Sequence, residues 1–124
     1  MSVDRAVVAN QPGGASLRNF NDEIVVKMQL EDDDEGWWIL MARVTLISSD
    51  SDRQNATAKL VHDANVVIIE ETNYMDYLDP ICVYLQVGFQ VKGKETVTLE
   101  CNTFKGVGNL GSVVALKVDE IDFQ

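Results

Sequence analysis

Hydrophobic and polar residues alternate with a period of two along most of the chain. This pattern predicts β-strands, because successive side chains of a strand point to opposite faces. The longest such run is 36–47, and one of its faces is wholly apolar. We predict that this face packs in the core; it carries Trp38, Leu40, Ala42, Val44 and Leu46.

The opposite face of the 36–47 run is also unusually apolar in its first half. It begins with Trp37, Ile39 and Met41, and it turns polar only at Arg43 and Thr45. A sheet face in contact with water is normally polar along its whole length. We therefore predict that a second surface covers this face.

Further strands are predicted wherever the same alternation recurs, and no stretch of ten residues shows a helical period. Turn signals fall about every dozen residues, which is typical of an all-β sandwich or barrel. The segments 71–80 and 104–111 are predicted to be loops, and 63–65 a turn. The additional strands are expected at 23–30, 55–62, 66–71, 81–91, 95–102 and 112–122.

The length of 124 residues suits a single domain over 1–124, with 1–20 as an N-terminal edge segment and 21–124 as the core sandwich. The net charge of -10 disfavours nucleic acid and anionic membranes as partners, since both would repel the chain. The sequence lacks the run of about 18 apolar residues that a membrane span needs, and its start lacks a signal peptide's apolar region. We expect a soluble chain without membrane insertion, whose compartment stays open.

Catalytic motifs are lacking. His62 is the only histidine and is followed by Asp63, but no G-x-S-x-G motif accompanies it. A single histidine at a strand end usually has a structural role, so we expect no enzyme. Cys82 and Cys101 form neither a C-x-x-C nor a zinc pattern, and both are expected to be free, buried thiols.

Two acidic loops offer the oxygen ligands that calcium prefers, although their spacing does not match an EF-hand. The plainer interpretation is that both are solvated loops, and calcium is the one cofactor we consider. The candidate ligands are Asp32, Asp33, Asp34, Asp50 and Asp52.

Aromatic side chains suggest an alternative function. Tyr74 and Tyr77 lie close together in a predicted loop, and aromatic rings can stack on the apolar faces of sugars. Trp38 is needed in the core, and Trp37 lies on the face that we expect to be covered. A monomeric carbohydrate-binding module using the two tyrosines, with or without Trp37, is therefore the alternative.

Three segments resemble the jelly roll of tumour-necrosis-factor-like cytokines and complement-type globular heads, including bacterial or phage-type relatives. The run 36–44 looks like the superfamily's glycine-aromatic strand leading into a core alanine. The segments 83–87 and 93–99 look like its late strand pair, and 113–121 looks like its closing strand. The resemblance spans roughly 24–122 and implies a jelly-roll β-sandwich of about eight to ten antiparallel strands.

The resemblance also implies an arrangement in space. The strands at 36–47, 81–91 and 112–122 would share one sheet, and the two strands flanking 92–94 would lie in different sheets. The outer face of the shared sheet would pack against two other subunits, giving a non-enzymatic homotrimer that presents its loops to a protein or glycan partner. A dimer through the same face stays open. The implied interface residues are Trp37, Ile39, Met41, Tyr84, Val113 and Ala115.

Overall fold

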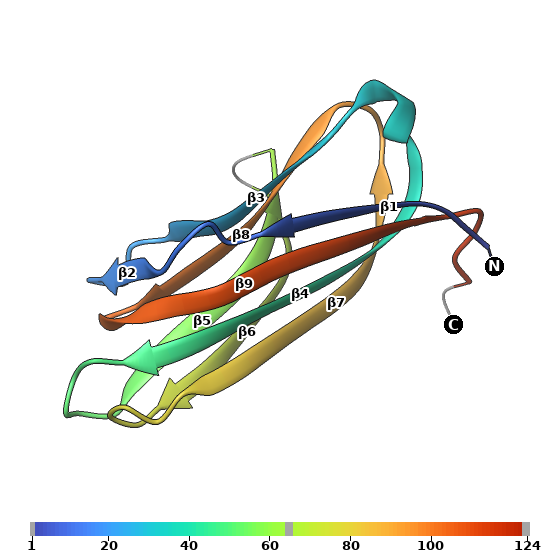
Figure 1. Cartoon of the computed structure of the whole chain (residues 1–124). Helices are drawn as coiled ribbons and strands as arrows, with labels where there is room; N and C mark the ends of the chain where they lie inside the picture. The colour runs from blue at the N-terminus through green and yellow to red at the C-terminus, as the bar shows by residue number, and fades with distance from the viewer. Residues whose placement is uncertain (1, 64–65, 123–124) are drawn as a thin grey trace.

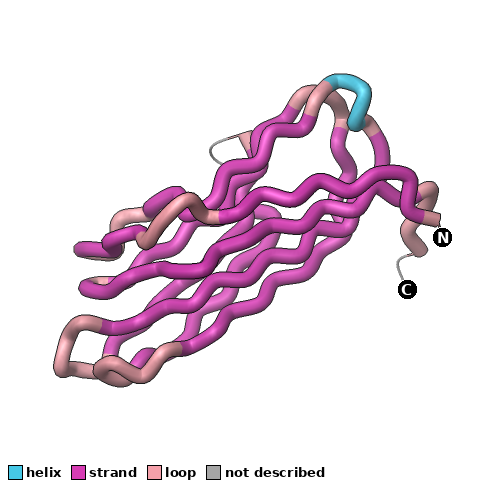
Figure 2. Tube along the Cα trace, in the orientation of Figure 1, coloured by secondary structure: helices cyan, strands magenta, loops and turns pink. Residues whose placement is uncertain are grey.

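The computed structural model describes residues 2–63 and 66–122, and within them the chain forms two antiparallel sheets packed face to face. Figures 1 and 2 show the two layers and the single short helical turn, η1 (Asp32–Asp34). The strands are β1 (Val3–Asn10), β2 (Ala15–Arg18), β3 (Glu23–Leu30), β4 (Gly36–Ser48), β5 (Gln54–His62), β6 (Val66–Met75), β7 (Ile81–Val91), β8 (Glu95–Thr103) and β9 (Lys105–Val118).

The first sheet has the order β1-β9-β4-β7, with β2 also pairing with β9, and the second has the order β3-β8-β5-β6. The strands expected to share one sheet, β4, β7 and β9, do so. Strands β7 and β8 are consecutive along the chain but lie in different sheets, so the turn between them crosses the sandwich. The predicted jelly-roll sandwich is confirmed.

The core lies between the sheets and is built on the inward face of β4. Trp38, Leu40 and Leu46 are fully buried there, and Ala42 and Val44 are nearly so, as the alternation predicted. The indole Nε1 of Trp38 donates a hydrogen bond of 2.7 Å to the backbone oxygen of Asp34. This bond satisfies the one polar atom of the largest core side chain, so its burial carries no unpaired donor.

A buried polar side chain links the two sheets at the end where β4 finishes. The Gln54 amide nitrogen donates to the Ser48 hydroxyl (2.5 Å) and to the Lys105 carbonyl (2.8 Å). Its oxygen accepts from the Thr103 hydroxyl (2.7 Å) and the Lys105 backbone nitrogen (2.9 Å). Because Ser48 and Lys105 belong to the first sheet and Thr103 to the second, Gln54 holds the sandwich closed at this end.

Two predicted loops are corrected by the structure. Strand β6 continues through Met75, so it includes the first half of the segment 71–80. Strand β9 begins at Lys105 and runs through the glycine-rich segment that had been interpreted as a loop. A Cβ at Gly106 would lie 2.5 Å from the Ile47 carbonyl oxygen, so glycine here permits close strand packing. The predicted turn at 63–65 falls partly on 64–65, outside the described residues.

The cysteines differ in their surroundings. Both are free, and Cys101 is buried, which raises the pKa of its thiol to about 12. Cys82 is exposed, which corrects the expectation that both thiols are buried. It alternates with the inward-facing Val83 on β7 and therefore points to the outer face of the first sheet.

Candidate functional site

The outer face of the first sheet carries two apolar rows that run across its strands. The strand register places Ala6, Leu116, Ile39 and Gly88 side by side. The next row along the strands joins Val8, Val114 and Met41, and ends at Gln86 on β7. We call these two rows the apolar rows; their large side chains are Val8, Ile39, Met41, Val114 and Leu116.

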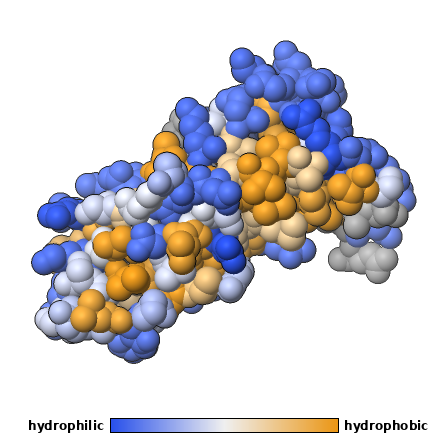
Figure 3. Space-filling model, in the orientation of Figure 1, coloured by the Kyte–Doolittle hydropathy of each residue, from blue (hydrophilic) through white to orange (hydrophobic). Residues whose placement is uncertain are grey.

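Several side chains on this face are in contact with water. Val8 is 59% exposed and Tyr84 67% exposed, while Met41 and Val114 are half-buried by their neighbours. Figure 3 shows hydrophobic surface gathered over this sheet, with hydrophilic surface around it. A continuous apolar sheet face bordered by polar residues is typical of a protein interaction surface.

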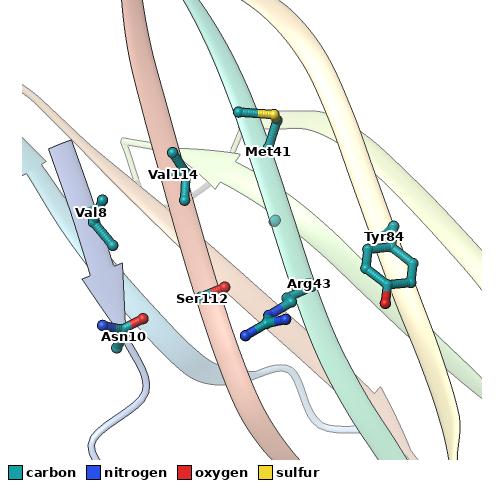
Figure 4. A pocket seen from close by; sticks show the side chains of 8 residues that line it. Val8, Asn10, Met41, Arg43, Tyr84, Ser112 and Val114 are labelled. Carbon is teal, nitrogen blue, oxygen red and sulfur yellow. The ribbon is translucent and has the colours of Figure 1, made fainter. Parts of the chain in front are cut away.

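A shallow hollow of about 380 Å³ lies on the same face, and Figure 4 shows the side chains around it. Its lining combines Val8, Met41 and Val114 of the apolar rows with Arg43 and Tyr84 of the next row. Among the described residues, no carboxylate lies within ion-pairing distance of Arg43. The hollow therefore offers a partner an apolar floor and one cationic group without a carboxylate partner.

Tyr84 keeps its phenol neutral at ordinary pH. The neighbouring Cys82 thiol is the main cause of an upward shift of the pKa of Tyr84. A neutral aromatic ring with a polar tip is well suited to an interface, since burying it desolvates no charge.

Of the six predicted interface positions, four lie on the outer face of the first sheet and two do not. Trp37, Ile39 and Met41 alternate with the core residues of β4, and Tyr84 lies on the outer face of β7. Val113 and Ala115, however, are fully buried in the core.

The register explains this correction. Val113 pairs with Ala42 and Ala115 with Leu40, and residues directly opposite one another in a sheet share a face. The outer positions of β9 are consequently Val114 and Leu116, which alternate with the two residues that had been predicted to face outward. Both faces of this segment are apolar, so alternation alone did not distinguish them.

The predicted calcium ligands do not form one site. The groups 32–34 and 50–52 lie at opposite ends of the 13-residue strand β4, roughly 40 Å apart. Asp34, predicted in an exposed loop, is fully buried; its carboxylate contacts Arg5 at 3.0 Å and accepts the Glu31 backbone nitrogen at 2.8 Å. Asp32 accepts a hydrogen bond from the Lys94 backbone nitrogen. Among the described residues, these aspartates do not take part in any cluster of three potential metal ligands.

Tyr74 and Tyr77 are exposed, at 63% and 53%, although Tyr74 belongs to β6 and not to a loop. The Arg53 guanidinium lies 4.8 Å from the centre of the Tyr74 ring, so one face of that ring is already covered.

Sequence reasoning missed two further aromatic residues at this end of the molecule. Phe20 and Phe104 are 52% and 46% exposed, and their rings lie 6.1 Å apart. They line a hollow of about 380 Å³ together with Asp50, Asp52 and Arg53. The only available signal was that Phe20 lies between two asparagines and Phe104 lies two residues before Gly106, as is common in turns. We call this surface the aromatic end; it comprises the four exposed aromatic residues Phe20, Tyr74, Tyr77 and Phe104, together with the exposed Leu78.

No family model matches the sequence, and no curated protein matches it. Among solved structures, the fold is similar to Eiger, a TNF from S. frugiperda, with a TM-score of 0.69, 6% identity and coverage of 95% of this chain and 96% of that one. It is similar to murine APRIL, with a TM-score of 0.62, 8% identity and coverage of 92% and 100%.

The fold is also similar to VP2 of infectious bursal disease virus, with a TM-score of 0.59, 11% identity and coverage of 94% of this chain. The chain spans about a third of that capsid protein, 34% of its length. At these identities the likeness shows the fold, which is a TNF-like jelly roll shared with capsid domains. Within the described residues, no helix is long and apolar enough to cross a membrane.

Proposed function

We propose that this chain is a non-enzymatic recognition module that assembles as a homotrimer through the outer face of the first sheet. The observation that carries the proposal is the pair of apolar rows, which the register aligns across β1, β9 and β4. The TNF-like fold supports the same face, because the resemblance noted in the sequence implies threefold packing there. Two further copies of this chain are the proposed occupants.

Assembly would bury the exposed parts of Val8 and Tyr84 together with the half-buried Met41 and Val114. Removing apolar surface from water stabilises an interface by about 25 cal/mol for each Å². Arg43, inside this surface, would then need an acceptor from a neighbouring copy, because a buried cation without a partner is costly. In the proposed trimer, the neighbouring copy must therefore place a hydrogen-bond acceptor or a carboxylate opposite Arg43.

The aromatic end would remain free in such an assembly and present its side chains to a partner. Phe20 and Phe104 stand beside Asp50, Asp52 and Arg53, so this surface combines apolar rings with charges of both signs. Binding surfaces of this kind are enriched in aromatic residues and arginine. A protein partner bound at this end is the recognition function we propose.

Two tyrosines of matched exposure provide the test. Tyr84→Asp places a carboxylate in the proposed interface, where burial costs about 3 kcal/mol or more, enough to weaken assembly roughly 100-fold. Tyr74→Asp makes the same chemical change on the second sheet at nearly the same exposure. Light scattering after size exclusion should show that Tyr84→Asp is monomeric and that Tyr74→Asp keeps the parent mass, with far-ultraviolet circular dichroism unchanged in both.

If Tyr84→Asp kept the parent mass, the proposed interface would be wrong. In the carbohydrate-binding alternative, Tyr74 and Tyr77 carry the function and Tyr84 does not. That alternative requires a monomer in which Tyr74→Ala and Tyr77→Ala abolish glycan retention. Retention of immobilised glycans by the parent chain, lost in these two variants and kept in Tyr84→Asp, would support that alternative.

A further inference from the structure

Three potential metal ligands meet at the end of the sandwich where β5 finishes and β8 begins. His62 is the last residue of β5, Asp63 follows it, and Glu95 is the first residue of β8. His62 pairs with the core residue Val97, which directs its ring into the space between the sheets. The ring packs against Phe89 of the first sheet, with centroids 4.9 Å apart. This contact fixes the imidazole orientation.

The three polar groups converge on one point. The His62 Nδ1 lies 3.5 Å from Glu95 Oε2 and 3.6 Å from Asp63 Oδ2. All three ligand atoms lie within 4.8 Å of one another, and this is the only such trio among the described residues. Four ligands placed tetrahedrally about 2.1 Å from a zinc ion are about 3.4 Å apart, which is close to the two observed separations.

A second observation points independently to a bound cation. The Glu95 side chain is only 10% exposed, and its Oε1 accepts a hydrogen bond of 3.2 Å from the Lys92 backbone nitrogen. Its other oxygen, Oε2, is buried without a hydrogen-bond donor, and the His62 Nδ1 is likewise buried without a hydrogen-bond partner. Buried polar atoms in native proteins are nearly always satisfied, so each such exception requires an explanation.

We propose that His62 Nδ1, Glu95 Oε2 and Asp63 Oδ2 bind a divalent transition-metal ion of the zinc type. One imidazole nitrogen and two carboxylate oxygens suit zinc, whereas calcium takes six to eight oxygen ligands. The Asp63 side chain is 56% exposed, so the fourth position of the metal opens to solvent. This proposal concerns the end of the sandwich and is independent of the sheet-face assembly.

The metal would hold together elements that are distant in the sequence. It would join the end of β5 to the start of β8, while the Phe89 contact continues the linkage to β7 in the other sheet. An ion that binds only the folded chain stabilises it by an amount that grows with the logarithm of its concentration once that exceeds the dissociation constant. Zinc should therefore raise the midpoint of thermal unfolding.

The single histidine makes the test direct. Tag-free protein labelled with ¹⁵N and treated with chelator should show one set of imidazole signals, because His62 is the only histidine in the chain. Adding one equivalent of zinc chloride should shift the Nδ1 signal, and calorimetry should give one ion for each chain. Calcium chloride should leave the imidazole signals unchanged.

Two variants and one control identify the ligands. Glu95→Gln and Asp63→Asn should each weaken zinc binding about tenfold or more, since each removes one ligand charge. Asp79→Asn changes an exposed aspartate elsewhere and should leave affinity unchanged. Because Asp63 is exposed, its variant tests the site even if Glu95→Gln fails to fold.

An Nδ1 signal that does not move with zinc would overturn the proposal. Equal loss of affinity in Asp79→Asn would also overturn it, since binding would then follow total charge and not this site.

Discussion

The outer faces of the two sheets differ in polarity: the outer face of the second sheet is polar, and that of the first sheet is largely apolar. On the second sheet, polar side chains pair with one another: Lys59 contacts Asp22 at 2.8 Å, and the Thr57 and Thr72 hydroxyls lie 2.8 Å apart. Asp22 also accepts a hydrogen bond from Asn102 at 2.7 Å. On the first sheet, the corresponding positions form the apolar rows.

The two outer sheet faces therefore differ in polarity and in how much each would be stabilised by contact with another surface. A polar face whose side chains pair with one another is stable in water and is not stabilised by a second surface. An apolar face of this extent is stabilised when another surface covers it. Both sheets pack on the same core, and an outward-facing substitution on either sheet leaves that core unchanged. Such a substitution therefore tests the properties of the surface and not the stability of the fold. The contrast also fits the proposed assembly of a chain whose net charge is -10, because one sheet face carries almost no charge.

The largest expected effect comes from adding charge to the apolar rows. Met41→Glu places a carboxylate between Val114 and Gln86, and it should weaken assembly by roughly 100-fold or more while leaving the fold intact. Asn55→Glu adds the same charge to an exposed position of β5 and should not change the mass. Sedimentation velocity measures both, and equal dissociation of the two variants would contradict the distinction between the faces.

A smaller effect is expected on the polar face. The hydrogen bond between Lys59 and Asp22 lowers the pKa of Asp22 below 3.8 and raises the pKa of Lys59 above 10.5. The aspartate's contribution is present above pH 3.8 and is lost as pH falls through its lowered pKa. The lysine's contribution is present below pH 10.5 and is lost as pH rises through its raised pKa. The pair therefore stabilises the fold across the whole range between.

Lys59→Met should cost about 0.5 kcal/mol of unfolding free energy at pH 7, the usual value for a partly exposed ion pair. Urea unfolding at pH 7 and at pH 2.5 measures this cost, which should shrink at the lower pH as Asp22 takes up a proton. Assembly should be unaffected. A loss of several kcal/mol, or a change in mass, would show that the polar face contributes more than its own pairing.

The sequence predicted the parts of the fold in which one face was clearly more apolar than the other. The inward set beginning at Trp38 follows from alternation alone, because its polar partners Arg43 and Thr45 mark the opposite face. Alternation failed at Val113 and Ala115, where both faces are apolar and only the register with β4 decides the direction. It failed again at Gly106, where a glycine that permits close strand packing had the appearance of a loop residue.

The candidate sites were less predictable, since they depend on contacts between distant strands. Val8 and Val114 become neighbours only through pairing of the first and last strands. His62 and Glu95 belong to different strands, and each alone has the appearance of an ordinary strand-end residue. Only the fold shows that the two meet beside Asp63.

Light scattering after size exclusion, over a range of concentrations, measures whether other copies cover the apolar rows of the unmodified chain. We predict a mass three times the 13.8 kDa of the single chain, falling toward the monomer only on strong dilution. A mass of 13.8 kDa at every concentration would contradict the proposed assembly, because the apolar rows would then remain uncovered in solution.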